Sequence, residues 1–460
     1  MLEQILEELL SLRQEVLLLR AENASLRLQV SSLTQELSSL TYQLEQSKIK
    51  KNSNNSSIPP SQDISRSNKS LRTSSGKPIG GQIGHEGKTL LFNESPTEVV
   101  DLMPTMCSSC GESLASTVGV FTQRRQLIDI PPVQISCTEY RQFTKQCSCC
   151  GNKEAAIFPK EVSNYIQYGS NIQTMAVYNW QHQYLPFKRL QQWFNDIFGL
   201  AISKGTLENM IRRVALNMQP AYQKIQQQIA LATCVGADET GVSINGKNNW
   251  IWVWQNNLYT FLSCSVSRGF KTIETLFPEG FVNAVLVSDR WKAQLATNAS
   301  SHQLCLAHLL RDANYIIEAE PSCNFATDLK ALLQKAIAHK NSFAESSIEN
   351  ITCKEIETAL DKLLEQNIEP TKHPHTTTLQ KSLLKYRGYL FKFLYHQEVP
   401  FENNASERSI RMIKVKQKIS GGFKSLQDAY CTIKSVVDTE IKKGINPFEI
   451  IKMAVMQGAG

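Results

Sequence analysis

The sequence predicts a multidomain protein: an N-terminal parallel coiled coil, a small zinc ribbon-like module, a helical segment, and an α/β ribonuclease-H-like catalytic core with a helical insertion. Three observations predict this order. A heptad repeat fills residues 1–45, two Cys-x-x-Cys pairs lie within residues 91–160, and strand-forming runs that lead into acidic residues follow residue 231. With 460 residues the chain is too long for one simple core and suggests roughly three domains.

Charge is distributed unevenly along the chain. The whole sequence holds 49 basic and 42 acidic residues, a net charge of +7. Residues 1–45 hold three Arg and seven acidic residues, a net charge of −4, so residues 46–460 carry +11. A basic body favours a polyanionic partner. Apolar residues make up 42% and charged residues 20%, which excludes a largely disordered chain.

The sequence also indicates a compartment. It opens on a charged helical repeat, which does not resemble a secretory signal. The uncharged stretch 248–267 consists of strand formers divided by a polar Gln-Asn-Asn turn, so a hairpin explains it better than a membrane helix. We therefore expect the twelve cysteines to be thiols or metal ligands in a reducing cytoplasm.

Residues 1–45 are predicted to be a leucine-zipper coiled coil. Six heptads carry apolar residues at a and d, and leucine fills nearly every d position. Asn23 is the one polar residue at an a position, where a buried pair of Asn side chains fixes the register of a parallel dimer. We predict a homodimer through this helix; the alternative is an amphipathic helix packed on its own domain. The residues expected at the dimer interface are Leu12, Leu19, Asn23, Leu26 and Leu33.

Residues 46–90 are predicted to be a flexible basic linker. They are rich in Ser, Asn, Lys and Gly, and cannot bury enough apolar surface to fold alone. Their basic side chains either contact phosphate or serve as ordinary solubilising charge.

Residues 91–160 are predicted to be a zinc-binding module. Two Cys-x-x-Cys-Gly knuckles each present two thiolates, and together they complete a tetrahedral structural site for Zn²⁺. The expected ligands are Cys107, Cys110, Cys147 and Cys150. Cys149 lies inside the second knuckle and leaves the fourth ligand ambiguous, and residues 134–140 are expected to be strands. The alternative is a set of reduced core cysteines.

Residues 161–230 are predicted to be helical, with a candidate helix-turn-helix. Helices are expected over 187–198 and 206–214, with Ser203 as the N-cap of the second. Such a helix pair either binds DNA or is a plain scaffold.

The ribonuclease-H-like core is predicted from residues 231–300 and 395–425. Residues 233–237 form an apolar run that leads into Asp238, and a later run, 284–288, ends at Asp289. Between them lie a strand hairpin and a short helix. In this strand order the first and fourth strands are neighbours, so the two acids could meet at one sheet edge. Their oxygens suit Mg²⁺ or Mn²⁺, and two such ions about 4 Å apart promote phosphodiester cleavage.

A third acid stands at the head of a basic helix. From residue 404 to residue 424 there are six basic residues and one acid, Glu407. A lone acid among cations suits a metal ligand flanked by phosphate contacts. The alternative is a solvent-exposed ion pair with Arg411.

Residues 301–394 are predicted to be a helical insertion into this core, and residues 426–460 a C-terminal helical segment. His302, Cys305 and His308 are spaced to share one helix face. We interpret Cys305 and His308 as a structural motif that braces the insertion, with a further zinc site as the alternative.

Four motifs resemble those of DDE transposases of insertion-sequence family sixty-six. They are Asp238-Glu239-Thr240, Asp289-Arg290-Trp291-Lys292, Cys305-x-x-His308-x-x-Arg311 and Asn404-Ala405-Ser406-Glu407-Arg408-x-x-Arg411. The zipper, linker, cysteine module and helical segment come in the same order as in that family, so the resemblance covers nearly the whole chain.

The resemblance implies a transposase that binds terminal inverted repeats of double-stranded DNA and catalyses metal-dependent cleavage and strand transfer. It implies a catalytic triad of Asp238, Asp289 and Glu407 that holds two Mg²⁺ or Mn²⁺ ions, beside a structural Zn²⁺. Two companion proteins of the same element are further candidate partners. We expect DNA contacts from Arg408, Arg411, Lys414 and Lys418. Two other functions stay open: a ribonuclease-H-like nuclease without strand transfer, and a non-catalytic zipper and zinc DNA-binding regulator.

Overall fold

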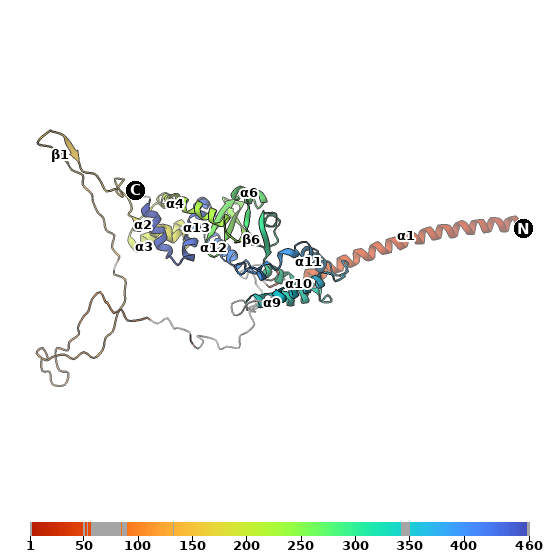
Figure 1. Cartoon of the computed structure of the whole chain (residues 1–460), viewed down its shortest axis with the longest axis horizontal. Helices are drawn as coiled ribbons and strands as arrows, with labels where there is room; N and C mark the ends of the chain where they lie inside the picture. Colours follow the sequence, from red (N-terminus) through yellow and green to blue (C-terminus); the bar gives the residue numbers. More distant parts are fainter. Residues whose placement is uncertain are drawn as a thin grey trace.

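The computed structural model describes residues 2–48, 51–52, 54–56, 84, 90–131, 133–341 and 350–457. Most of the predicted linker, 46–90, lies outside these residues. Helix α1 (Leu2–Lys48) projects from an α/β body that contains the remaining helices and the large sheet (Figure 1). Among the described residues, no helix is long and apolar enough to span a membrane.

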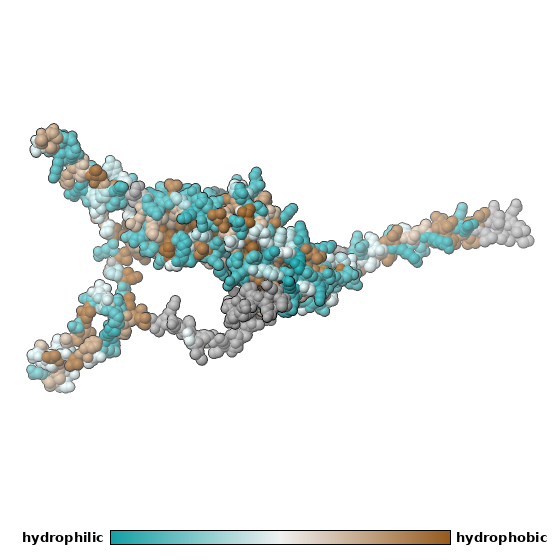
Figure 2. Space-filling view, viewed as in Figure 1, coloured by the Kyte–Doolittle hydropathy of each residue, from teal (hydrophilic) through white to brown (hydrophobic). Residues whose placement is uncertain are grey.

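The N-terminal helix is confirmed, and its apolar stripe lies in solvent. Leu12, Leu19, Leu26 and Leu33 are each at least half exposed. Figure 2 shows apolar residues distributed along the part of α1 that it colours. The alternative in which this helix packs on its own domain is therefore wrong for these four leucines. The coiled-coil partner stays a prediction.

A short described stretch of the linker is docked on the body. Asn55 is buried, and its Nδ2 donates to Glu318 Oε2 at 2.6 Å. Nδ2 of Asn314 donates to the carbonyl of Asn54 at 3.0 Å. The chain just after α1 is therefore attached to the first helix of the insertion.

The cysteine-rich segment contains little regular structure. Strands β1 (Thr144–Gln146) and β2 (Lys153–Ala155) pair antiparallel around the second knuckle. The prediction of strands over residues 134–140 is wrong, because these residues are exposed and pair with no other strand in the described chain. They are not held by a hydrophobic core.

Four helices follow and form one side of the main core. They are α2 (Ser170–Gln181), α3 (Phe187–Phe198), α4 (Lys204–Asn217) and α5 (Gln219–Ala230). The two predicted helices and the Ser203 N-cap are confirmed, and a DNA-binding role for the pair stays a prediction. Gly199 ends α3 at a φ of +65°, and Ser203 caps α4 by accepting the Thr206 N–H at 3.1 Å. Phe194, Leu207 and Ile211 are buried in the shared core.

A five-stranded mixed sheet has the order β5-β4-β3-β6-β7. Its strands are β3 (Cys234–Ile244), β4 (Lys247–Gln255), β5 (Thr260–Ser265), β6 (Phe281–Ser288) and β7 (Ala299–Leu304). Strands β3, β4 and β5 are antiparallel, whereas β6 and β7 run parallel to β3. Helices α6 (Phe270–Leu276) and α7 (Lys292–Leu295) lie in the connections. The predicted adjacency of the first and fourth strands is confirmed.

Strand β7 corrects the sequence interpretation of the insertion. His302 lies on this strand, pairs with Leu286 and is buried. The predicted helix face shared by His302, Cys305 and His308 is therefore wrong, because His302 precedes the helix. The described insertion is helical only from Leu306 onward, and residues 301–304 belong to the sheet.

The insertion has a hydrophobic core of its own. It contains α8 (Leu306–Ala319), α9 (Phe325–Asn341), α10 (Asn350–Leu364) and α11 (Pro374–Lys385), followed by short 3-10 turns η2 (Arg387–Tyr389) and η3 (Lys392–Leu394). Val285 and Val287 of β6 join this second core. The sheet is thus the wall between the two cores.

Three C-terminal helices complete the body. Helix α12 (Asn404–Ser420) packs on β3 and β4, and α14 (Pro447–Gln457) packs on α2. Helix α13 (Gln427–Lys442) covers β5, the sheet's edge strand. Hydroxyls of Ser435 and Thr439 accept the backbone N–H groups of Leu262 and Thr260 at 2.8 and 3.0 Å. These bonds satisfy donors that an edge strand leaves unpaired.

Candidate active site

Strand β3 places Asp238 beneath helix α12. Residues alternate along a strand, so Gly236 and Asp238 share one face of β3. Gly236 pairs with Val287 in the parallel register, which brings Asp238 level with the end of β6. Asp238 is half-buried, and its Oδ1 accepts the N–H of Glu239 at 2.8 Å.

The second acid lies directly after β6. Asp289 is half-buried, and its Oδ1 accepts the backbone N–H of Trp291 at 2.8 Å. The carbonyl of Ser288 accepts the N–H of Cys305 at 2.8 Å, which fixes the end of the strand to the start of α8. The local turn and the strand end therefore both restrain Asp289.

The third acid, Glu407, is placed by contacts at the start of α12. The buried side chain of Asn403 donates to the Ala237 carbonyl at 2.7 Å, next to Asp238. The N–H of Asn403 in turn donates to Cys305 Sγ at 3.2 Å. Glu407 lies in the first turn after this anchor, and its charge acts on Asp238. In the described residues the donor atoms of Asp238, Asp289 and Glu407 do not all lie within 4.8 Å of one another, so the structure brings the three acids to one region without closing them into a single ligand group.

Carboxylates crowd this site. Burial, and then the negative charges of Glu239, Asp289 and Glu407, raise the pKa of Asp238 well above its ordinary value. Oε1 of Glu407 is buried and accepts no hydrogen bond in the described structure. A raised pKa and an unpartnered carboxylate oxygen are both features that a bound cation would compensate. The donor set, three carboxylates, fits Mg²⁺ or Mn²⁺.

Two basic side chains of α8 flank Glu407. Arg311 Nη2 lies 3.7 Å from Oε2, and His308 Nδ1 lies 4.0 Å from Oε1. Burial, followed by the charge of Arg311, lowers the pKa of His308, which favours the neutral imidazole. Among the described residues, one group of three potential ligands has donor atoms all within 4.8 Å, namely Cys305, His308 and Glu407. Cys305 and His308 therefore lie against the proposed third acid.

The other face of β3 carries a different carboxylate. Glu239 is buried, and it accepts hydrogen bonds from Arg268 at 2.8 Å and Gln294 at 3.1 Å. The Arg268 guanidinium lies over the rings of Trp291 at 3.8 Å and Trp250 at 4.8 Å. Sequence reasoning gave Glu239 no role of its own. Its position next to Asp238 could have indicated a separate role. Adjacent residues of a strand face opposite sides of the sheet, so Glu239 and Asp238 cannot bind the same ion from one face.

The predicted DNA-contact residues lie on α12 and are exposed: Arg408, Arg411, Lys414 and Lys418. Lys414 differs from the other three because its Nζ donates to the Gly241 carbonyl at 2.6 Å. Lys416, between them, is buried, which no feature of the basic run indicated.

The two cysteine knuckles have the same local geometry. In each, the glycine N–H donates to the first cysteine's carbonyl at 2.9 Å, and Gly111 and Gly151 have φ values of +74° and +75°. Backbone N–H groups three and two positions further along each turn lower the pKa of Cys107 and of Cys147. The structure does not bring the two pairs together, since the described residues contain no four-cysteine cluster.

Comparisons with known proteins agree with this arrangement. Residues 166–430 match the family model described as Transposase IS66 family, a DDE transposase. Residues 104–151 match the zinc-finger binding domain of transposase IS66. The first match contains all three acids, and the second contains both cysteine pairs. No curated protein matches the chain.

Proposed function

The chain belongs to the transposase IS66 family, and from this premise we propose how its residues perform DNA cleavage and strand transfer. Asp238, Asp289 and Glu407 are the proposed catalytic triad. The single observation that supports this assignment is that the charges of Asp289, after β6, and Glu407, on α12, both act on the buried carboxylate of Asp238, whose pKa is raised. When bound there, two divalent ions would supply charge neutralisation for the attacking and leaving oxygens of a phosphodiester.

The protein's own groups hold this arrangement in place. Asn403 anchors α12 to β3, and Cys305 accepts the Asn403 N–H from the side of α8. Arg311 Nη2 lies 3.7 Å from Glu407 Oε2 and places a positive charge beside this carboxylate. Arg408, Arg411 and Lys418 extend from α12 into solvent, where they would contact DNA phosphates and orient the strand.

The reaction has two displacements at phosphorus. In the first, water attacks a phosphodiester at the end of the element, and a strand with a 3′-hydroxyl is released. In the second, that hydroxyl attacks a phosphodiester of target DNA, gives up its proton, and displaces the target's own 3′-oxygen. No covalent bond to the protein forms in either displacement.

The test uses full-length protein and DNA that carries the ends of the element around its gene. With Mg²⁺, we expect cuts at the ends of the inverted repeats, mapped at nucleotide resolution, and joined products when target DNA is added. Asp238→Asn should bind the ends and leave them uncut. Cleavage without joined products would indicate a nuclease, and binding without cleavage by the natural sequence would indicate a regulator.

A structural Zn²⁺ held by Cys107, Cys110, Cys147 and Cys150 is a second part of the proposal. The matching turns align Cys150 with Cys110, and Cys149 with Ser109, so Cys150 is the proposed fourth ligand. We expect Cys150→Ser to lower the zinc content measured by atomic emission and Cys149→Ser to retain it. Equal loss in both variants would contradict the alignment.

A homodimer through α1 is the third part. The exposed leucines of α1 need an apolar partner, and Asn23 would set the parallel register. Light scattering should give a dimer mass for the full chain. A double variant, Leu19→Lys with Leu26→Lys, should give a monomer, and a dimer that survives this change would place the interface elsewhere.

A further inference from the structure

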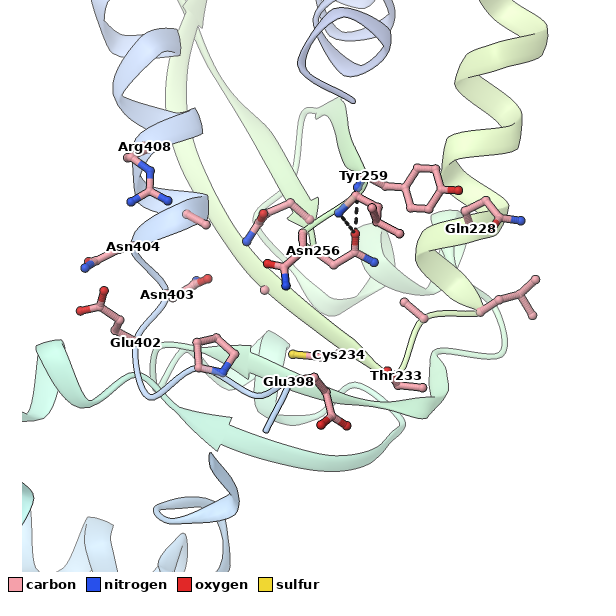
Figure 3. Close-up of a pocket in the computed structure, with 18 residues that line it drawn as sticks. Gln228, Thr233, Cys234, Asn256, Tyr259, Glu398, Glu402, Asn403, Asn404 and Arg408 are labelled. Atoms are coloured by element: carbon pink, nitrogen blue, oxygen red, sulfur yellow. Dashed lines mark hydrogen bonds between the residues drawn. The ribbon is translucent and has the colours of Figure 1, made fainter. Parts of the chain in front are cut away.

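A cavity of about 580 Å³ lies beside the catalytic face. It is formed by the end of α5, the start of β3, the turn after β4, and the start of α12. Figure 3 shows side chains from these separate segments around one space. The volume falls within the range of protein sites that hold small ligands.

One wall contains a buried polar atom without a partner. Asn403 is 4% exposed, and its Nδ2 donates to Ala237, which fixes the amide and leaves Oδ1 without a hydrogen bond. Oδ1 lies 2.6 Å from the point that a Cβ on Gly236 would occupy, and Nε2 of Gln255 lies 2.9 Å from the same point. The acceptor Oδ1 of Asn403 and the donor Nε2 of Gln255 therefore both lie next to Gly236, which has no side chain to fill the space between them.

The lining residues are suited to a nucleobase more than to a phosphate. Six of them are amides: Gln228, Gln255, Asn256, Asn257, Asn403 and Asn404. Arg408 is the one cation among the described residues that line the cavity, whereas Glu398 and Glu402 are acids. Phosphate sites collect cations, but base edges present mixed donors and acceptors that amides and carboxylates match. Leu231 and Leu258 are more than half exposed and offer apolar surface for a base.

The cavity adjoins the proposed catalytic residues along two of the three elements that position them, β3 and α12. Gly236 precedes Asp238 by two positions on the same face of β3. Arg408, at the rim, follows Glu407 directly on α12 (Figure 3). A DNA strand that reaches the three acids therefore passes close to the cavity.

We propose that this cavity receives one unstacked nucleobase of the DNA strand next to the cut. The amides would bond the base edge, and Arg408 would contact the adjoining phosphate. Enzymes that withdraw a base from a duplex must replace its stacking and pairing contacts, and the apolar and amide walls supply such replacements. The inference rests on the proposed function, because it requires DNA ends at the acidic site.

The test places the fluorescent base 2-aminopurine at one position per duplex, on each side of the mapped cut. We expect full-length Asp238→Asn protein to bind these ends without cutting them, and binding is followed separately by gel shift. We expect fluorescence to rise several-fold at one position and to stay low at its neighbours. Ala232→Trp, which fills the cavity, should abolish the rise and weaken binding about tenfold.

Two matched controls separate the cavity from general effects. Ala221→Trp adds the same side chain to an exposed position of α5 outside the cavity. Gln227→Ala removes an exposed amide beside Gln228, and Gln228→Ala removes one from the cavity wall. We expect both controls to keep the signal and Gln228→Ala to lower it.

The outcomes distinguish a failure of the base-binding inference from a failure of the proposed function. If the ends are bound and the natural sequence cuts them, but no position brightens, or if the signal survives Ala232→Trp, the cavity does not hold a base. If the ends are neither bound nor cut, the proposed function fails and the inference fails with it.

Discussion

The two faces of strand β3 bury carboxylates in opposite ways. On one face Glu239 is bonded to Arg268 and Gln294, with the guanidinium between two tryptophan rings. On the other face, burial and then the charges of Glu239, Asp289 and Glu407 raise the pKa of Asp238. Burial raises the pKa of Glu239 as well, although Gln294 and Arg268 oppose that shift. A paired carboxylate belongs to the architecture of the protein. A crowded carboxylate without an opposing charge is relieved by a proton or by a cation from solution, so the comparison contrasts a paired acid with the proposed catalytic one.

The largest expected effect tests this separation directly. Asp238→Asn should lower the cleavage rate by on the order of a thousandfold or more, because an amide brings no negative charge to a divalent ion. Glu239→Gln should stay within about tenfold of the natural protein, since it does not face the site. Single-turnover cleavage of end DNA in Mg²⁺ measures both.

The same pair of variants has a stability readout. Without metal, Asp238→Asn should melt no lower than the natural protein, because the change removes repulsion among carboxylates. Glu239→Gln should melt lower, because it removes the charge that Arg268 contacts. Equal effects of the two variants on rate would refute the division of β3 into a catalytic face and a structural face.

The second prediction concerns how closely α12 approaches β3. A Cβ at Gly236 would lie 2.6 Å from Asn403 Oδ1 and 2.9 Å from Ser406 Oγ, so Gly236→Ala must displace these side chains, and Asn403 is the anchor of the helix that carries Glu407. Cleavage should fall about a hundredfold, because a shift near 1 Å of a catalytic group has effects of that size. Unfolding in urea should show a loss of about 1–3 kcal/mol.

A matched glycine on the same strand provides the control. A Cβ at Gly241 would meet the Trp250 ring at 3.7 Å or more, an ordinary contact. Gly241→Ala should leave cleavage close to the natural rate. If Gly236→Ala is equally harmless, the position of Glu407 does not depend on this close approach.

These anchors explain what the sequence could and could not predict. Asp238 and Asp289 followed from strand order, because alternation and the adjacency of the first and fourth strands are general rules. The place of Glu407 depends on bonds from Asn403 to Cys305 and Ala237, which are 98 and 166 residues away in the chain. No local pattern encodes such contacts, so this acid was indicated by resemblance to a family.

Two other regions show the same difference between features that local sequence predicts and features that tertiary contacts decide. The cysteine turns were predictable because each forms within five or six consecutive residues, as the paired bonds of Cys107 and Cys147 show. Strand β7 was missed because it contains His302 and Gln303, polar residues that a buried parallel strand seldom holds. The helical insertion provides a partner for one of these buried polar side chains, because Gln303 Nε2 donates to the Leu390 carbonyl at 2.9 Å. Sequence patterns predicted local geometry, and tertiary partners decided the rest.

The third prediction tests the paired face. Arg268→Met leaves the buried charge of Glu239 with Gln294 alone, and should lower the free energy of unfolding by about 2–3 kcal/mol, less than for a fully buried pair because the Arg268 side chain is 35% exposed. Adding Glu239→Gln should recover part of the loss, because the unpaired charge is then gone. Urea unfolding of the single and double variants measures the difference. An additive loss would mean that the two side chains contribute independently.

The smallest predicted effect concerns Lys416, a buried lysine whose charge faces a tryptophan ring and a carbonyl. Lys416 has no carboxylate partner; its Nζ donates to the Trp180 carbonyl at 2.9 Å and lies 4.1 Å from the Trp180 ring centre. Burial lowers the pKa of Lys416 from 10.5 to about 7. Above pH 7 the unfolded chain therefore holds a proton that the folded chain has released, so stability rises with pH until the unfolded value is reached. The free energy of unfolding, compared with that of Lys416→Met, should rise by about 1 kcal/mol per pH unit between pH 7 and 9.

Lys418→Met, an exposed change on the same helix, is the control and should keep the natural pH slope. Urea unfolding at pH 6.5, 7.5 and 8.5 gives the three slopes. If Lys416→Met also keeps the natural slope, the lysine stays charged inside the folded protein. The tryptophan ring and carbonyl would then stabilise a buried cation as effectively as a carboxylate does. In that case burial alone would not set the pKa of this lysine, because the ring and the carbonyl would compensate for the lost water.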